Sequence, residues 1–230
     1  MAERGMERFQ KTDVLRMFPC FVWKAELARE IAAPMNAALL AALAEIGAPL
    51  HELAYGQSWQ SAHDLHRRAP FQELVGCIHG AAEAVLDYLK IGVGPESNKA
   101  GSNEAGLAIT GCWANVNAPG AAHPEHSHPN NYLSGVYYLV TPAGADTIDF
   151  HDPRPQTGII RPPVTALTAE NTDEVVVRVA AGMLLLFPAW LSHSVDANAS
   201  SELRISVSFN LMFSSYAETM GQPMWEPGTR

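Results

Sequence analysis

The chain has 230 residues, which is enough for one domain with a substantial hydrophobic core. Apolar residues make up 47% of it and charged residues only 17%, so it is neither a disordered chain nor a coiled coil. Its 24 acidic and 15 basic residues give a formal net charge of -9, which argues against a nucleic-acid backbone or an anionic membrane as the partner.

The sequence pattern predicts neither a membrane span nor export. The longest apolar run, at 183–191, is far shorter than the roughly 20 residues that a helix needs to cross a bilayer. No apolar stretch typical of a secretory signal follows the charged first residues. Cys20, Cys77 and Cys112 are odd in number and widely spaced, as expected of reduced thiols. We therefore expect a cytoplasmic protein that binds neither membrane nor nucleic acid.

Residues 1–105 are predicted to be mostly helical, after a short extended segment at 17–23. Apolar residues recur every four positions in an Ala-rich stretch that Pro34 interrupts, which predicts a short helix and then a longer one ending near Gly47. The residues with this spacing are Leu27, Ile31, Met35, Leu39 and Leu43. A second apolar stripe predicts a helix from Pro70 to about Gly92. We expect this portion to pack on the rest of the chain, within a single domain of residues 1–230.

From residue 106 to 215 the pattern changes to short β-branched and aromatic runs separated by Pro, Gly and Asn. Eight short strands are predicted here, a density typical of a jelly roll or barrel. They are expected at 107–117, 122–128, 132–140, 147–151, 174–179, 183–187, 192–195 and 203–213. The sequence therefore predicts a mainly β core flanked by α-helices, with a C-terminal tail at 216–230.

Two histidines of the β portion stand two residues apart. Because alternate side chains of a strand point to one face, His126 and His128 can direct both imidazoles toward one point. Imidazole is the commonest side-chain metal ligand. The pair by itself fits a metal site and two surface histidines beside a turn about equally well.

A third histidine and an arginine follow further along the chain. His193 comes five residues after the end of the buried run 182–188, and Arg204 and Ser206 share one face of the last predicted strand. A guanidinium is costly to bury unless an anion receives it, and a carboxylate is its natural partner. That carboxylate belongs either to a bound ligand or to a nearby Asp or Glu of the chain.

These elements, in this order, resemble the Fe(II)/2-oxoglutarate-dependent dioxygenases over residues 107–213. The likeness is to the prolyl-hydroxylase-like branch, and within it to a bacterial group of 2OG-Fe(II) oxygenases. The motifs are Trp-Ala-Asn-Val-Asn at 113–117, His-Ser-His-Pro at 126–129, Leu-Ser-Gly-Val-Tyr-Tyr-Leu at 133–139, Gly-Met-Leu-Leu-Leu-Phe-Pro at 182–188, His193 and Arg-Ile-Ser at 204–206. The resemblance implies a double-stranded β-helix, which is a jelly roll, as the catalytic core.

The resemblance also implies roles for single residues. It makes His126 and His193 ligands of Fe(II). It implies that the far carboxylate of the co-substrate 2-oxoglutarate binds to Arg204 and Ser206. Other residues that it places around the co-substrate are Tyr138, Asn117 and Asn115. From the residues alone, Tyr138 fits a packed core tyrosine equally well.

The third metal ligand departs from the pattern of the wider family, in which Asp or Glu follows two residues after the first histidine. Here that residue is His128, so we expect a metal bound by His126, His128 and His193. A neutral imidazole in place of a carboxylate leaves the iron one unit more positive, which could tighten the binding of an anionic co-substrate.

Other ionisable side chains near these motifs have alternative roles. Asp149 and Asp152 stay open as the third ligand, because they lie on or beside another predicted strand. Glu125 is a poor ligand candidate, since it points to the opposite strand face from His126. His123 is expected beside the metal site or facing the substrate.

The predicted activity is hydroxylation of an aliphatic carbon with Fe(II), 2-oxoglutarate and O2, which gives succinate and CO2 as co-products. The substrate is expected to be a small molecule or a peptide, and Arg154 and Arg161 in a Pro-rich loop are candidate substrate contacts. Two alternatives stay open: a cupin-like three-histidine iron dioxygenase that needs no 2-oxoglutarate, and a non-catalytic metal- or ligand-binding β-barrel. The helical portion could also support a homodimer.

Overall fold

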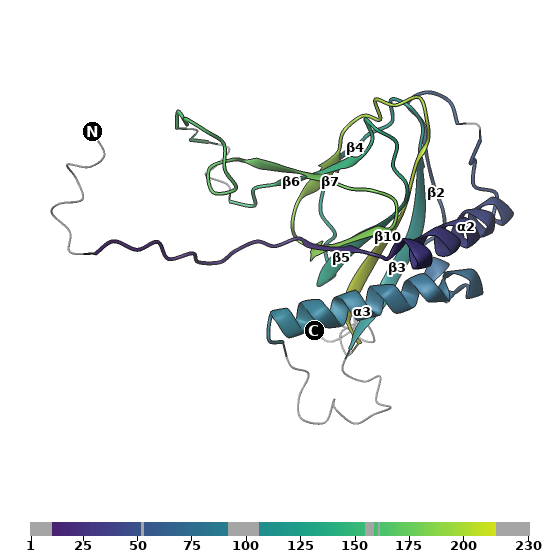
Figure 1. Cartoon of the computed structure of the whole chain (residues 1–230), viewed down its shortest axis with the longest axis horizontal. Coiled ribbons are helices and arrows are strands. Elements are labelled where there is room, and N and C mark those ends of the chain that lie inside the picture. Colours follow the sequence, from purple (N-terminus) through teal and green to yellow (C-terminus); the bar gives the residue numbers. More distant parts are fainter. Residues whose placement is uncertain (1–10, 52, 92–105, 155–158, 161, 215–230) are drawn as a thin grey trace, which may run out of the picture.

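Two antiparallel sheets form the centre of the molecule (Figure 1). The structure is a computed structural model that describes residues 11–51, 53–91, 106–154, 159–160 and 162–214. The larger sheet has the strand order β1-β8-β5-β10-β3-β2 and the smaller has the order β4-β9-β6-β7. The strands are β1 (Trp23–Glu26), β2 (Ser58–Gln60), β3 (Leu107–Asn117), β4 (His123–His126), β5 (Leu133–Val140), β6 (Thr147–His151), β7 (Glu174–Arg178), β8 (Met183–Pro188), β9 (His193–Val195) and β10 (Arg204–Phe213).

This architecture confirms the predicted mainly β fold with a jelly-roll core. All eight predicted strands are present, and their ends differ from the prediction by no more than one or two residues. The extended segment predicted at 17–23 was misplaced, because β1 begins only at its last residue, Trp23. β2 was not predicted, since its three residues are too few and too polar to give a strand pattern.

The larger sheet has one apolar face and one largely polar face, because side chains alternate along each strand. On β3, Cys112, Ala114 and Val116 belong to a hydrophobic cluster with the helices. Their neighbours Trp113, Asn115 and Asn117 point to the other face, toward the smaller sheet. The helices thus bury one face of the larger sheet and leave the other to line the interior of the jelly roll.

Two long helices cover the apolar face of the larger sheet (Figure 1). They are α2 (Arg29–Glu45) and α3 (Gln72–Tyr88), and two short 3-10 turns, η1 (Leu65–Arg67) and η2 (Ala69–Phe71), precede α3. The predicted break at Pro34 was wrong, because α2 runs through this residue without interruption. Met35, Leu39 and Leu43 are buried against the sheet, and this packing outweighs the hydrogen bond that the proline removes.

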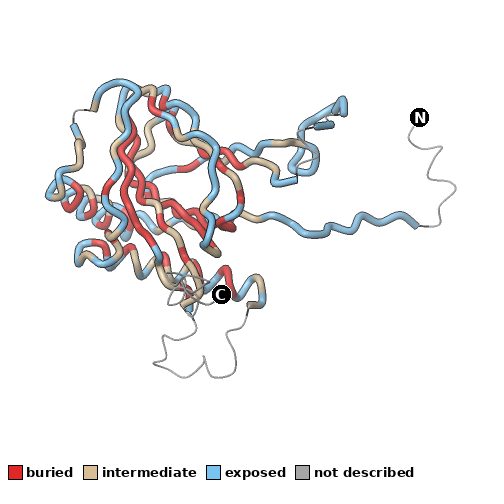
Figure 2. The backbone as a smooth tube through the Cα atoms, turned by 180° about the vertical axis from the view of Figure 1, so that it is seen from behind, coloured by how far each residue is buried: buried red, intermediate tan, exposed pale blue. Residues whose placement is uncertain are grey.

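Burial follows the strands and the inner faces of the helices, whereas the first described residues are exposed (Figure 2). Residues 11–20 extend away from the sheets without regular structure. Arg16 and Glu170 form an exposed ion pair at 3.7 Å between this segment and the loop before β7. Within the described residues, no helix is long and apolar enough to cross a bilayer.

Candidate active site

Three histidines meet between the smaller sheet and the polar face of the larger one. His126 on β4 lies opposite His193 on β9 in the strand pairing, and His128 follows two residues after His126. One ring nitrogen of each lies within 4.8 Å of the others. The ring centroids are 4.4 Å apart for His126 and His193, 5.0 Å for His126 and His128, and 5.2 Å for His128 and His193. This spacing suits three imidazoles around a single metal ion.

Backbone carbonyls orient two of these rings. His126 Nδ1 donates to the Pro124 carbonyl at 2.9 Å, and His193 Nδ1 donates to the Leu191 carbonyl at 3.0 Å. Each bond fixes the tautomer that carries its proton on Nδ1, so Nε2 keeps a free lone pair. Burial lowers the pKa of His128 and of His193 to about 4, so both rings are neutral near pH 7. These two side chains are therefore ready to bind a metal without first losing a proton.

The alternative third ligands lie elsewhere. In the pairing of β6 with β9, Phe150 is opposite His193 and Asp149 is opposite Ser194, so Asp149 faces away from the histidines. Asp152 accepts hydrogen bonds from the Arg154 side chain at 2.5–3.1 Å. Among the carboxylates named by the sequence, none joins the histidine cluster.

Arg204 begins β10 at the deep end of the same pocket, and it is only 3% exposed. Its Nε donates to the Ala145 carbonyl at 3.1 Å, and no Asp or Glu of the described residues forms an ion pair with it. The guanidinium carbon lies 5.3 Å from the centroid of the Tyr138 ring. A buried cation that forms no ion pair with the described residues favours a bound ligand as the partner of this arginine over a salt bridge within the chain.

Tyr138 and Ser206 add hydroxyl groups beside Arg204. Ser206 lies opposite Tyr138 in the pairing of β10 with β5, so both side chains point to the same face. The Tyr138 hydroxyl is buried and has no hydrogen-bond partner among the described residues. Burial raises the pKa of Tyr138 to about 12, which keeps this hydroxyl protonated as a donor. The donor set of one guanidinium and two hydroxyls fits the far carboxylate of 2-oxoglutarate, and the histidine cluster fits Fe(II).

The two asparagines of the Trp-Ala-Asn-Val-Asn motif have different surroundings. Asn117 Nδ2 donates to Ser58 Oγ at 2.9 Å and to His123 Nε2 at 2.7 Å. His123 is therefore an acceptor at Nε2, in keeping with a pKa that burial, and secondarily Arg204, lowers to about 4. Asn115 instead joins a hydrogen-bonded row along the pocket wall, where it accepts from Gln60 Nε2 at 3.0 Å.

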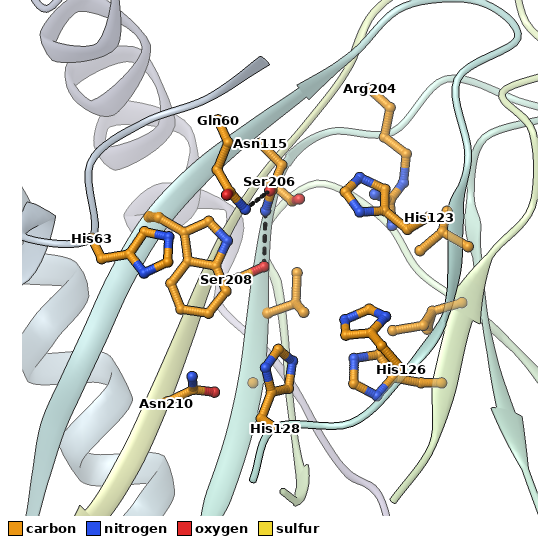
Figure 3. Close-up of a pocket in the computed structure, with 16 residues that line it drawn as sticks. Gln60, His63, Asn115, His123, His126, His128, Arg204, Ser206, Ser208 and Asn210 are labelled. Carbon is orange, nitrogen blue, oxygen red and sulfur yellow. Dashed lines mark hydrogen bonds between the residues drawn. The ribbon is translucent and has the colours of Figure 1, made fainter. Parts of the chain in front are cut away.

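The pocket has a volume of about 310 Å³ and receives side chains from both sheets (Figure 3). The pocket residues to which the sequence analysis assigned no role include Gln60, His63, Trp113, Ser208 and Asn210. Ser208 and Asn210 continue the every-second-residue pattern that begins with Arg204 and Ser206, so strand periodicity could have found them. Gln60 and His63 come from the mostly helical half, and nothing in their local sequence points to the pocket.

Arg154, one of the two arginines proposed as substrate contacts, does not line the described pocket. The Arg154 side chain binds Asp152 instead, at 2.5 Å between Nη2 and Oδ2. Arg161 lies outside the described residues. Glu125, expected to face away from the histidines, accepts a hydrogen bond from Ser192 Oγ at 2.6 Å.

A family model supports the resemblance noted from the sequence. Residues 111–210 match the family described as "Putative 2OG-Fe(II) oxygenase". This match confirms the resemblance over the segment that holds the three histidines and Arg204. No curated protein matches the chain.

Several solved structures share the fold of this chain. The non-heme alpha ketoglutarate dependent epimerase SnoN from nogalamycin biosynthesis superposes with a TM-score of 0.57 at 17% identity, over 84% of this chain and 78% of that chain. The same epimerase has been solved with Fe3+, alpha ketoglutarate and nogalamycin RO. A Pseudomonas putida prolyl-4-hydroxylase gives a TM-score of 0.54 at 14% identity, over 84% and 92% of the two chains. A Trichoplax adhaerens prolyl hydroxylase in complex with a hypoxia inducible factor peptide gives 0.55 at 12% identity, over 87% of each chain. At these identities the likeness establishes the double-stranded β-helix fold.

Proposed function

We propose that this chain is a 2-oxoglutarate- and Fe(II)-dependent oxygenase and that it hydroxylates an aliphatic carbon of its substrate. The observation that supports the proposal is the placement of two complementary sites in one pocket. Three imidazoles stand at one side, and the buried Arg204 stands at the deep end without an ion-pair partner among the described residues. A keto acid with a second carboxylate would use both sites, whereas an iron dioxygenase without a co-substrate does not need the arginine site.

In this proposal His126, His128 and His193 hold the iron, and the three proton-free nitrogens supply its protein ligands. Arg204, Tyr138 and Ser206 bind the far carboxylate of 2-oxoglutarate through charge-assisted and hydroxyl hydrogen bonds. When bound, iron and 2-oxoglutarate supply the oxidising chemistry, in which a C–H bond, O2 and 2-oxoglutarate become a C–OH group, succinate and CO2. The chain itself binds and orients these groups.

The surroundings of His193 exclude water from one side of this site. The rings of Phe187 and Phe150 lie 4.7 Å and 6.1 Å from the His193 ring, and both phenylalanines are buried. Ile148 is also buried and lines the pocket. An apolar wall protects a reactive centre from side reactions with solvent.

The substrate is proposed to be a small molecule or a peptide. Structures with this fold include an enzyme solved with nogalamycin RO and another solved with a peptide, so the fold accommodates both kinds of ligand. We also propose a cytoplasmic location, which the free thiols of Cys20, Cys77 and Cys112 support, because reducing compartments preserve such thiols. A homodimer stays a prediction from the sequence.

The function is tested by anaerobic spectroscopy and by product analysis. Protein with one equivalent of Fe(II) under argon should develop a visible charge-transfer band on titration with 2-oxoglutarate. On admission of O2, succinate should form in proportion to the 2-oxoglutarate consumed. His193→Ala should lose the iron and the band, whereas His51→Ala, which removes an exposed histidine on the other half of the chain, should keep both.

Two results would contradict the proposal. One is the absence of the band in the parent protein with iron bound. The other is a His193→Ala protein that holds a full equivalent of iron and forms the band like the parent.

A further inference from the structure

The pocket wall carries a row of polar side chains that extends beyond the co-substrate end. On β10, Arg204, Ser206, Ser208 and Asn210 alternate toward the pocket. The first two are 3% and 2% exposed, whereas Ser208 and Asn210 are half-buried. The pocket therefore opens along β10 from Arg204 toward Asn210, and Figure 3 shows these two residues at opposite ends of the wall.

The hydrogen bonds between the wall residues occupy acceptor atoms of Ser208 and Asn210, and they leave donor groups of the wall without partners among the described residues. Ser134 Oγ donates to Asn210 Oδ1 at 2.8 Å. The Asn210 amide N–H groups have no hydrogen-bond partner among the described residues. Asn115 Nδ2 donates to Ser208 Oγ at 2.9 Å, which leaves the Ser208 hydroxyl proton available. The Trp113 indole N–H, opposite Ser208 in the pairing of β3 with β10, also has no hydrogen-bond partner within the described part of the chain. The open end of the pocket is rich in donors.

No acidic side chain is among the described residues that line the pocket. The ionisable side chains among its described lining residues are five histidines and Arg204, without any Asp or Glu, although the chain as a whole has 24 acidic and 15 basic residues. With three neutral imidazoles on Fe(II), a dianionic co-substrate and one guanidinium, the loaded pocket has a net charge of about +1. An Asp or Glu ligand in place of His128 would have made this sum zero.

We propose that the substrate of this enzyme is an organic acid, whose carboxylate binds at the open end of the pocket to Asn210, Ser208 and Trp113. This inference rests on the proposed function and names the substrate class for the same site. The Trp113 ring centroid lies 6.0 Å from that of His128 and 4.5 Å from that of His63, which stacks on it. A carboxylate held beside Trp113 therefore places the rest of the substrate next to the metal ligands.

Replacing the amide nitrogen of Asn210 by oxygen, in Asn210→Asp, tests this assignment. Asn210→Asp keeps an oxygen to accept from Ser134 Oγ but replaces the free amide donors with negative charge. Asn36→Asp is the matched control, because Asn36 Oδ1 on α2 accepts from the Tyr137 hydroxyl at 2.7 Å and the residue does not line the pocket. Both variants add the same charge to the chain, and only one adds it at the proposed subsite.

The probes are N-acetyl-L-amino acids, each paired with its C-terminal primary amide. Binding is measured as the rise in thermal unfolding temperature of protein loaded with Fe(II) and 2-oxoglutarate under argon, and turnover is measured in parallel as succinate release in air. In the parent and in Asn36→Asp, at least one acid should bind about tenfold or more tightly than its amide. In Asn210→Asp, this preference should fall by about tenfold or more.

Three outcomes would overturn the inference: amides that bind as well as their acids, a panel in which no acid binds, or an Asn210→Asp protein that keeps the parent preference. The charge-transfer band separates this failure from failure of the proposed function. If the parent lacks the band with iron bound, the function itself is wrong. If the band forms and acids are not preferred, only the substrate class is wrong.

Discussion

Replacement of Arg204 by methionine separates a ligand-binding arginine from a structural one. In the free protein Arg204 is buried, donates one hydrogen bond to the Ala145 carbonyl and has no acidic partner among the described residues. Burial is the main cause that lowers the pKa of Arg204, and Tyr138 and Asp149 oppose this shift without cancelling it. Methionine fills much of the same space without the charge. Arg204→Met should therefore leave the stability of the ligand-free protein within about 2 kcal/mol of the parent.

The effect on 2-oxoglutarate should be far larger. A guanidinium can form two parallel hydrogen bonds to a carboxylate, and a hydrogen bond to a charged group contributes about 1.5–3 kcal/mol. Loss of both corresponds to about 3–6 kcal/mol, or an increase of about 10²-fold to 10⁴-fold in the Kd of 2-oxoglutarate. The Tyr138 and Ser206 hydroxyls remain and can still bind the carboxylate. We therefore expect the increase in Kd to lie near the lower end of this range.

Calorimetric titration of the Fe(II) protein with 2-oxoglutarate under argon measures the Kd, and thermal unfolding without ligand measures the stability. Arg178→Met is the control, because the Arg178 side chain is 78% exposed and pairs with Asp146 at the surface. A Kd within about threefold of the parent would refute the anchor role of Arg204, since one lost hydrogen bond alone exceeds that change. A ligand-free variant destabilised by more than about 4 kcal/mol would show instead that Arg204 is structural.

Four further predictions concern the metal ligands and the sheet that supports them. His128→Asp should retain close to one equivalent of iron, whereas His128→Leu should lose iron affinity by at least about tenfold, and equal retention by both would remove His128 from the ligand set. Because burial lowers the pKa of His128 and His193 to about 4, bound metal should be retained as the pH falls from 7 to about 5 and released only nearer 4. Metal release that begins near pH 6.5 would contradict this prediction. The same depressed pKa values mean that the unfolded chain takes up more protons below pH 6.5, so the apoprotein should lose stability as the pH falls from about 6.5 to 4, as followed by thermal unfolding. Gly135→Ala should destabilise the protein by about 1–3 kcal/mol in chemical denaturation, since the new Cβ would lie 2.5 Å from the Leu185 carbonyl oxygen, whereas Gly76→Ala in α3, with no atom within 4 Å, should not.

The β half could be predicted closely from the sequence because its periodicity reports burial directly. β3 and β6 have the predicted bounds, Leu107–Asn117 and Thr147–His151. The helical half was less predictable, since the intrinsic effect of Pro34 competes with packing that forms only in the folded protein. Buried Met35, Leu39 and Leu43 hold α2 continuous against the sheet, a contribution that local propensity does not contain.

The sequence also showed the order of the chemical groups along the chain, but it did not show which groups lie next to each other in space. The spacing of two residues between His126 and His128, and again between Arg204 and Ser206, is sufficient by itself to place each pair on one strand face. The role of Asp149 stayed open, because the face to which it points depends on the register of β6 with β9. A register different by one residue would have turned Asp149 toward the histidines.

Local sequence was sufficient to predict a jelly roll with helices, because strand periodicity is a local property. It was also sufficient to predict which histidines and which arginine share a strand face with a second site residue, since side chains alternate along a strand. Which groups share the pocket depends on the tertiary fold. His193 meets His126 through the pairing of β4 with β9, and Gln60 reaches Asn115 through the pairing of β2 with β3. Those contacts join residues more than fifty positions apart, and their positions follow from how the sheets close around the core rather than from any local pattern.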